Sequence, residues 1–320
     1  KLMDKSSASL HSLSFKLTEG RLPEPIEVKT SASYKDSLIS LDQLLLDTGR
    51  SLLRAQAWSN VQDSSLSAHA EASPFLLHDL QPYLDTELPE DEIDLSLEAG
   101  GSLDSLQIRI KANSKSFDDL FVITDLSLAD VPTLKKFGIT GKNLDLSHFT
   151  QDSVDAFVGD FRVSAEGSVT RDYKKADLTW GFTFNEILYD EYQLQIFFGS
   201  GTLIAGQFLA NFQMTDGRDK IVLNSSVDSL WSEQPVWSAA TTLSNINLGW
   251  WLKNPELQSD ISLSASINGQ GFQLSERPWK FSVRPTQSVV EVVRNKDAGS
   301  GQFSVRPIFA TDTVTVADQS

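Results

Sequence analysis

Apolar and polar residues alternate along most of this chain, and the pattern is clearest near residue 100. Leu95 and Leu97 share one parity, with polar or charged residues on either side of each. After the Gly100-Gly101 pair, Ile108 resumes the same alternation. A period of two directs successive side chains to opposite faces of a strand. This stretch therefore predicts a β-hairpin with one apolar and one polar face.

The same period recurs through the whole sequence, and no long segment has the 3.6-residue period of an amphipathic helix. Turn signals rich in Gly, Pro, Asn and Asp interrupt the alternation at short intervals, which gives about 20 candidate strands. Helical crossovers, which a parallel sheet requires, are missing from the pattern. We therefore predict an all-β, mainly antiparallel fold.

Short apolar segments that do not alternate separate some of the hairpins. The first, LLHDLQPYL at residues 76–84, has leucines spaced three and four apart, as on one side of a short helix. We expect two or three such helical plugs, each followed by amphipathic strands, in an irregular repeat. The three copies are aligned on the dipeptides Asp79-Leu80, Asp130-Val131 and Asn247-Leu248.

Three segments are expected along one continuous sheet. Residues 1–73 are predicted to form a β-meander, and residues 74–170 two plug-plus-hairpin repeats. Residues 171–320 are predicted to form an apolar segment that contains the third plug. The alternation is already under way at the start and unfinished at the end, which predicts a piece of a longer protein.

The amino-acid composition of the chain argues against several classes of function. A formal net charge of −16 argues against a nucleic-acid partner, because phosphate backbones require a basic surface. The chain has no cysteine, so disulfides, thiolate metal sites and a cysteine nucleophile are excluded. No apolar run reaches the roughly 18 residues that a membrane-spanning helix needs.

Catalytic and metal-binding patterns are not found. The segment GSGTLIAG at residues 199–206 lacks the Lys-Ser/Thr ending of a phosphate-binding loop, and no nucleophile-elbow motif occurs. We predict a chain that is not an enzyme and that has no metal and no cofactor. The four histidines are too far apart in sequence to form an obvious metal-ligand set: His11, His69, His78 and His148.

Alternation by itself leaves two architectures open. In a β-sandwich, two apolar sheet faces cover each other. In an open trough, the apolar face is covered by something other than protein. Periodicity does not separate these two possibilities.

A resemblance to a known family favours the trough. The plugs that lead into LSLEAGGSLDSLQIRIKA and NINLGWWLKNPELQSDISLSASINGQG, and the earlier block ISLDQLLLDTGRSLLRAQAWSN, resemble the TamB branch of the AsmA-like superfamily. The similarity covers residues 35–115 and 235–285 best. It implies a long, curled β-groove in the periplasm of diderm bacteria, anchored in the inner membrane by a segment outside this chain. Family members are implicated in phospholipid transport between the membranes and in outer-membrane protein assembly.

This resemblance implies phospholipid acyl chains as the ligand, with an outer-membrane assembly barrel as a possible partner through parts outside this chain. A charged headgroup would stay at the open edge of the groove, near water. The residues expected to line the groove are Leu95, Leu97, Ile108, Ile110, Phe161, Val163, Trp180, Phe182, Phe184, Leu194, Ile196, Leu263 and Ile267. The residues expected to form plugs are Leu80, Leu84, Trp250 and Trp251.

The competing hypothesis is a β-sandwich scaffold that binds protein or glycan through its loops and has no enzymatic activity. It predicts fully covered apolar faces and exposed aromatic side chains at loop tips, such as Trp231 or Trp237. The groove predicts one continuous apolar surface with no protein over it.

Overall fold

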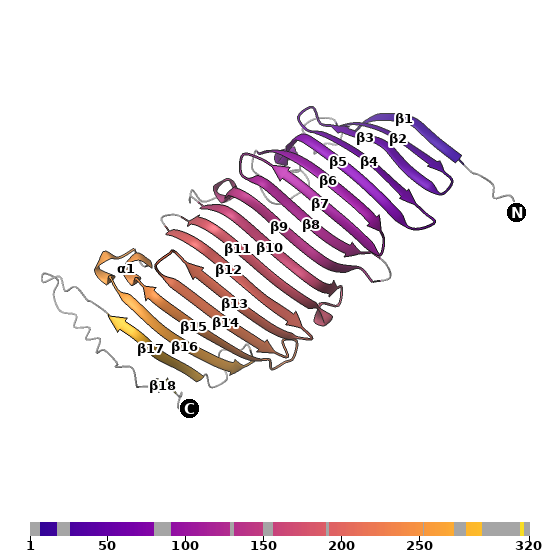
Figure 1. Ribbon diagram of the computed structural model, residues 1–320. Helices are drawn as coiled ribbons and strands as arrows, with labels where there is room; N and C mark the ends of the chain where they lie inside the picture. The colour runs from indigo at the N-terminus through magenta and orange to yellow at the C-terminus, as the bar shows by residue number, and fades with distance from the viewer. Residues whose placement is uncertain are drawn as a thin grey trace. The chain divides into compact units, whose positions relative to one another are not determined.

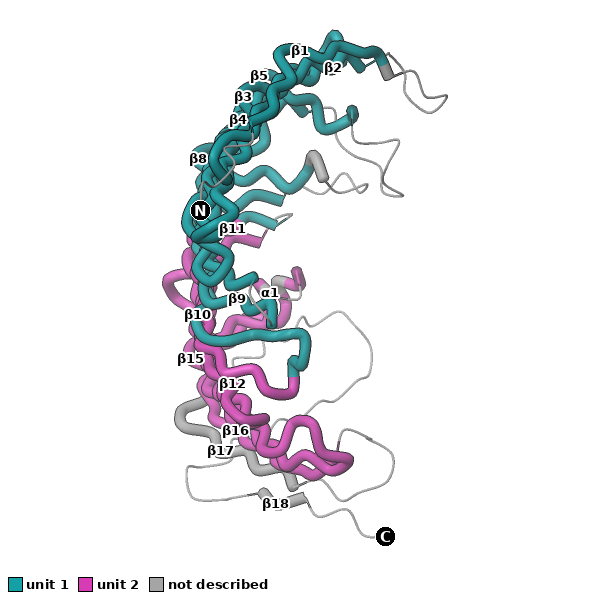
Figure 2. The backbone as a smooth tube through the Cα atoms, turned by 90° about the vertical axis from the view of Figure 1, so that its right-hand side faces the viewer, with its two compact units in different colours: residues 1–173, 188–191 teal, residues 174–187, 192–320 magenta. Residues whose placement is uncertain are grey.

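The computed structural model describes residues 7–17, 26–79, 91–128, 131–149, 156–189, 192–251, 253–271, 280–289 and 314–316 (Figure 1). The chain is all-β, with antiparallel strands and 6% helix, as the alternating pattern predicts. It divides into two compact units, which are coloured separately in Figure 2. Unit 1 comprises Lys1–Tyr173 with Leu188–Glu191, and unit 2 comprises Lys174–Ile187 with Tyr192–Ser320.

Unit 1 contains ten strands in sequence order, and each pairs antiparallel with the next. They are β1 (Ser7–Leu17), β2 (Ile26–Lys35), β3 (Leu38–Asp47), β4 (Leu52–Asn60), β5 (Ser65–Leu76), β6 (Glu92–Ser102), β7 (Ser105–Asn113), β8 (Asp118–Ser127), β9 (Thr133–Asp145) and β10 (Ala156–Thr170).

Unit 2 follows the same plan. From β12 to β18, each strand pairs antiparallel with the next. Among the described strands, the sheet does not close into a barrel. The strands are β11 (Asp177–Tyr189), β12 (Tyr192–Ile204), β13 (Gln207–Thr215), β14 (Lys220–Asp228), β15 (Val236–Ile246), β16 (Asp260–Gln270), β17 (Lys280–Val289) and β18 (Val314–Val316).

Helical structure in the described part is limited to short turns. A 3-10 turn covers residues 77–79, directly after β5. The others are η2 (Leu146–Phe149), η3 (Tyr173–Lys175), α1 (Leu248–Trp251) and η4 (Pro255–Leu257). The second repeat was expected at Asp130-Val131, but Val131 lies in a bend, and the helical turn comes later, at η2.

Bulges keep apolar residues on one side where the sequence spacing changes. On β3, Leu41 pairs with Ala57 and Leu44 pairs with Ala55, so three residues of β3 span two of β4. Without the extra residue, an interval of three would place Leu44 on the opposite face of the sheet from Leu41. The bulge keeps both leucines on the same face. At such positions, alternation along the sequence assigns the following side chains to the wrong face.

Few apolar side chains in the described part are fully buried, and they do not form the thick core of a two-layer domain. Within each unit, the main contacts between elements join consecutive strands, or a strand or helix to a short helical turn next to it. Figure 2 shows the strands of unit 1 edge-on as a single curved layer. The buried apolar residues are Val28, Ala72, Leu106, Ala112, Phe117, Ala156, Val158, Phe161, Ala176, Ala210 and Ile246.

Candidate functional site

One face of the unit 1 sheet is apolar across all ten strands. Residues directly opposite each other in an antiparallel ladder share a face, so the printed registers trace rows across the sheet. One row crosses the unit with a single polar member: Leu13, Thr30, Leu44, Ala55, Ala70, Leu97, Ile110, Val122, Ile139 and Val163.

A second row lies beside it on the same side: Leu10, Ala32, Leu41, Ala57, Ala68, Ala99, Ile108, Thr124, Phe137 and Ala165. We call these two rows, with the residues of the same parity that flank them, the apolar face of unit 1. The six lining residues predicted in this unit all fall on it: Leu95, Leu97, Ile108, Ile110, Phe161 and Val163.

The other side of the same strands is polar. The row directly behind the first is Ser14, Lys29, Leu45, Arg54, Glu71, Ser96, Lys111, Phe121, Thr140 and Arg162. On the central strands, Glu98 and Arg109 of this polar face are exposed, whereas Leu97 and Ile110 of the apolar face are half-buried. The apolar side chains thus shelter one another, although no second sheet faces them in the described part of unit 1.

Unit 2 has an apolar face as well, and its β11–β13 region is aromatic. Trp180 stacks on Phe182 at 6.2 Å between ring centroids, and Phe182 meets Phe197 edge-on at 4.9 Å. Phe212 lies 5.8 Å from Trp180 and 6.2 Å from Phe182. Phe184 joins the cluster at 5.3 Å from Phe182. The predicted residues Trp180, Phe182 and Phe184 are therefore together.

From β12 to β16 this face continues in register. One row is wholly apolar: Phe197, Met214, Ile221, Leu243 and Leu263. Leu263 and Ile267, both predicted to line the site, lie on this side, with Ile267 opposite Ala239. We call this row, with the aromatic cluster and the flanking residues of the same parity, the apolar face of unit 2.

The prediction that Ile196 joins Phe182 is wrong. Phe182 contacts Phe197, so the odd-numbered residues of β12 share its face. Ile196 has the other parity and is 37% exposed, whereas Leu194 is half-buried between the exposed Gln193 and Gln195. In the sequence, Leu194, Ile196 and Phe198 alternate with Gln193 and Gln195, so the pattern favours the even-numbered residues, whereas the aromatic cluster includes Phe197.

Glycines supply the missing signal. A Cβ added at Gly199 would lie 2.6 Å from the Phe182 ring, so this ring occupies the space above the glycine. Pairing a strand glycine with an aromatic side chain on the neighbouring strand covers the gap that the glycine leaves. The same pairing occurs for Gly141 with Phe161, Gly201 with Trp180 and Gly269 with Trp237. All four glycines have the same parity as the residues of the apolar face on their strands. A glycine of this kind therefore identifies the side of the strand that faces the aromatic residues, which the hydrophobic pattern alone does not.

The predicted plug residues are only partly described. Leu80 and Leu84 lie outside the described residues, as does the side chain of Trp251. Trp250, on α1, packs edge-on against Tyr192 at 5.4 Å, and the Lys253 ammonium lies 5.0 Å from the same tyrosine ring.

Three of the described helical turns, at residues 77–79, η2 and α1, are each held by a short turn two strands earlier. The Leu76 N–H donates to Ser51 Oγ at 2.8 Å, and the Asn247 N–H donates to Asp219 Oδ2 at 3.1 Å. Between them, the Asp145 N–H donates to the carbonyl of Ser116 at 2.8 Å. All three acceptor residues are buried: Ser51, Ser116 and Asp219. Two of these contacts lie at the expected repeat positions near Asp79 and Asn247, whereas the middle one lies at η2 and not at Asp130-Val131.

Removing the Ser51 hydroxyl should loosen the first helical turn. This hydroxyl also donates to Asp79 Oδ2 at 2.6 Å, so Ser51→Ala leaves both the Leu76 N–H and Asp79 short of a partner. We expect a loss of about 1–3 kcal/mol in the free energy of unfolding, and faster amide exchange at residues 76–79. Ser33→Ala is the control, since this hydroxyl makes no hydrogen bond to another described residue. Equal exchange in both variants would contradict the anchoring role.

Ionisable groups lie away from the apolar faces. At the start of unit 1, Lys16 Nζ is 2.9 Å from Glu27 Oε1, and both side chains are well exposed. The hydrogen bond and charge of Lys16 hold the pKa of Glu27 below its ordinary value. No cluster of His, Asp or Glu among the described residues could hold a metal ion.

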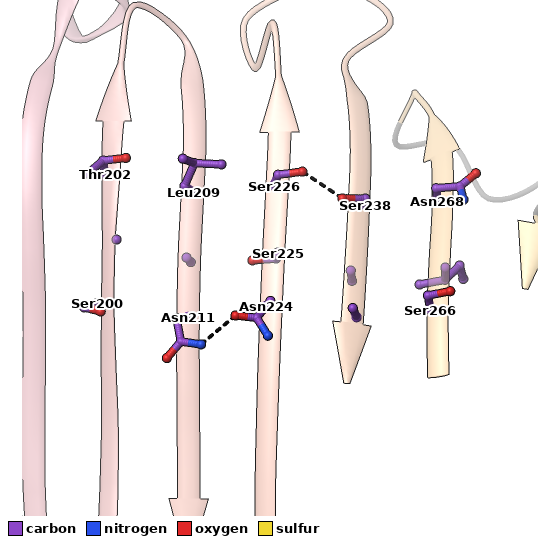
Figure 3. A pocket seen from close by; sticks show the side chains of 15 residues that line it. Ser200, Thr202, Leu209, Asn211, Asn224, Ser225, Ser226, Ser238, Ser266 and Asn268 are labelled. Atoms are coloured by element: carbon purple, nitrogen blue, oxygen red, sulfur yellow. Dashed lines mark hydrogen bonds between the residues drawn. The ribbon is translucent and has the colours of Figure 1, made fainter. Parts of the chain in front are cut away.

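A shallow depression bordered by several serine and asparagine side chains lies on the opposite side of unit 2 (Figure 3). It has a volume of about 600 Å³, and two rows of side chains on β12–β16 border it. Asn211 Nδ2 donates to Asn224 Oδ1 at 2.6 Å, and the Ser226 and Ser238 hydroxyls are 2.7 Å apart. Many of its hydrogen-bonding groups are thus already paired with each other.

The chain matches no protein-family model, no characterised protein sequence and no solved structure. Among the described helices, none is long and apolar enough to cross a membrane.

Proposed function

We propose that the apolar faces of this chain hold the acyl chains of phospholipids, as the groove of a TamB/AsmA-like protein would. The observation that supports the proposal is the row from Leu13 to Val163, which crosses all ten strands of unit 1 and is apolar on every strand except β2, where it contains Thr30. Ten strands at about 4.8 Å spacing give about 43 Å of continuous apolar surface within that unit. Soluble monomers rarely leave apolar patches larger than a few hundred Å² uncovered.

The energetic argument concerns the transfer of acyl chains from water to the apolar sheet face. Two acyl chains of about 16 carbons expose roughly 25 kcal/mol of CH₂ surface to water, at ~0.8 kcal/mol per group. Contact with an apolar sheet face offsets part of this cost. The unit 1 face is mainly aliphatic, with Phe137 and Phe161 as aromatic members, and its two rows lack charged side chains. Adjacent positions should therefore differ little in affinity, so that an acyl chain can move between them.

Within this proposal, the chain is a periplasmic segment of a longer protein anchored in the inner membrane of a diderm bacterium. It carries phospholipid between the inner and outer membranes, or supports outer-membrane protein assembly, and it has no catalytic role. We favour the groove over the sandwich scaffold because each unit has its strands in a single layer, without a facing sheet in the described part.

The direct test is lipid extraction and mass spectrometry on the protein purified without detergent. We expect co-purified phospholipid in near-stoichiometric amount. A lipid-free, monodisperse protein that also takes up no phospholipid from vesicles would overturn the proposal.

A further inference from the structure

We draw no further inference here: the strongest candidate, the shallow depression that Ser200, Asn211, Asn224 and Ser238 border on β12–β16 of unit 2, carries no proposal because nothing in the structure shows what covers it.

Discussion

A Leu97→Asp variant is expected to lose about tenfold or more of its bound phospholipid. Leu97 lies at the centre of the apolar face of unit 1, between Ala70 and Ile110. A carboxylate there would have to lose its hydration under an acyl chain, which costs more than the 1.4 kcal/mol that corresponds to tenfold in affinity. Lipid per protein, measured by mass spectrometry after detergent-free purification, gives the result.

Ser96→Asp is the matched control for this variant. Ser96 is the preceding residue on the same strand and lies on the polar face, so the same charge is added on the opposite side. We expect this control to retain its lipid. Circular dichroism and thermal unfolding of both variants separate lost binding from lost folding, and Leu97→Thr offers a milder change if the aspartate variant does not fold. Equal lipid content in Leu97→Asp and Ser96→Asp would argue against acyl-chain binding on this face.

A clear loss of stability is expected for Gly199→Ala. The added methyl group would lie 2.6 Å from the Phe182 ring and 2.8 Å from the Phe212 ring, so both aromatic side chains must move. Such overpacking costs about 1–3 kcal/mol. Urea unfolding followed by tryptophan fluorescence should show a lower midpoint, because Trp180 belongs to the same aromatic cluster.

Gly100→Ala is the control with the same chemical change. The nearest atom to its added Cβ is the Leu66 carbonyl oxygen at 4.0 Å, so the methyl group has room. The unfolded-state effect of replacing glycine by alanine is common to both variants and favours stability by about 0.4–1 kcal/mol. We therefore expect Gly100→Ala to be neutral or slightly stabilised.

A double-mutant cycle would identify the cause. If the Phe182 ring is what collides with the new methyl group, Gly199→Ala should cost much less in a Phe182→Ala background. An unchanged cost in that background would place the strain elsewhere, for example at Phe212.

The apolar face of unit 1 could be predicted from the sequence because the local pattern there is unambiguous. On β6 and β7, one parity is apolar and the other is polar, so burial of the apolar side and the pairing of Leu97 with Ile110 follow from a single choice of register. The six lining residues predicted in this unit fall on one face for that reason. The prediction for Ile196 on β12 is wrong because the alternation of Leu194, Ile196 and Phe198 with glutamines favours the even-numbered residues, whereas Phe197 is the residue that contacts Phe182.

What the sequence determined by itself is the class of fold: a period of two, frequent turn signals and no helical period lead to antiparallel strands, because side-chain direction along a strand is a local property. Three features were decided only by the tertiary structure. The first is the side of β12 that joins the aromatic cluster, and the second is the bulge on β3 that keeps Leu44 on the apolar face. The third is the pair of contacts by which Ser51 and Asp219 hold helical turns two strands away. These features depend on the register between strands and on contacts across at least 25 residues of chain, and neither is encoded in the spacing of residues along one strand.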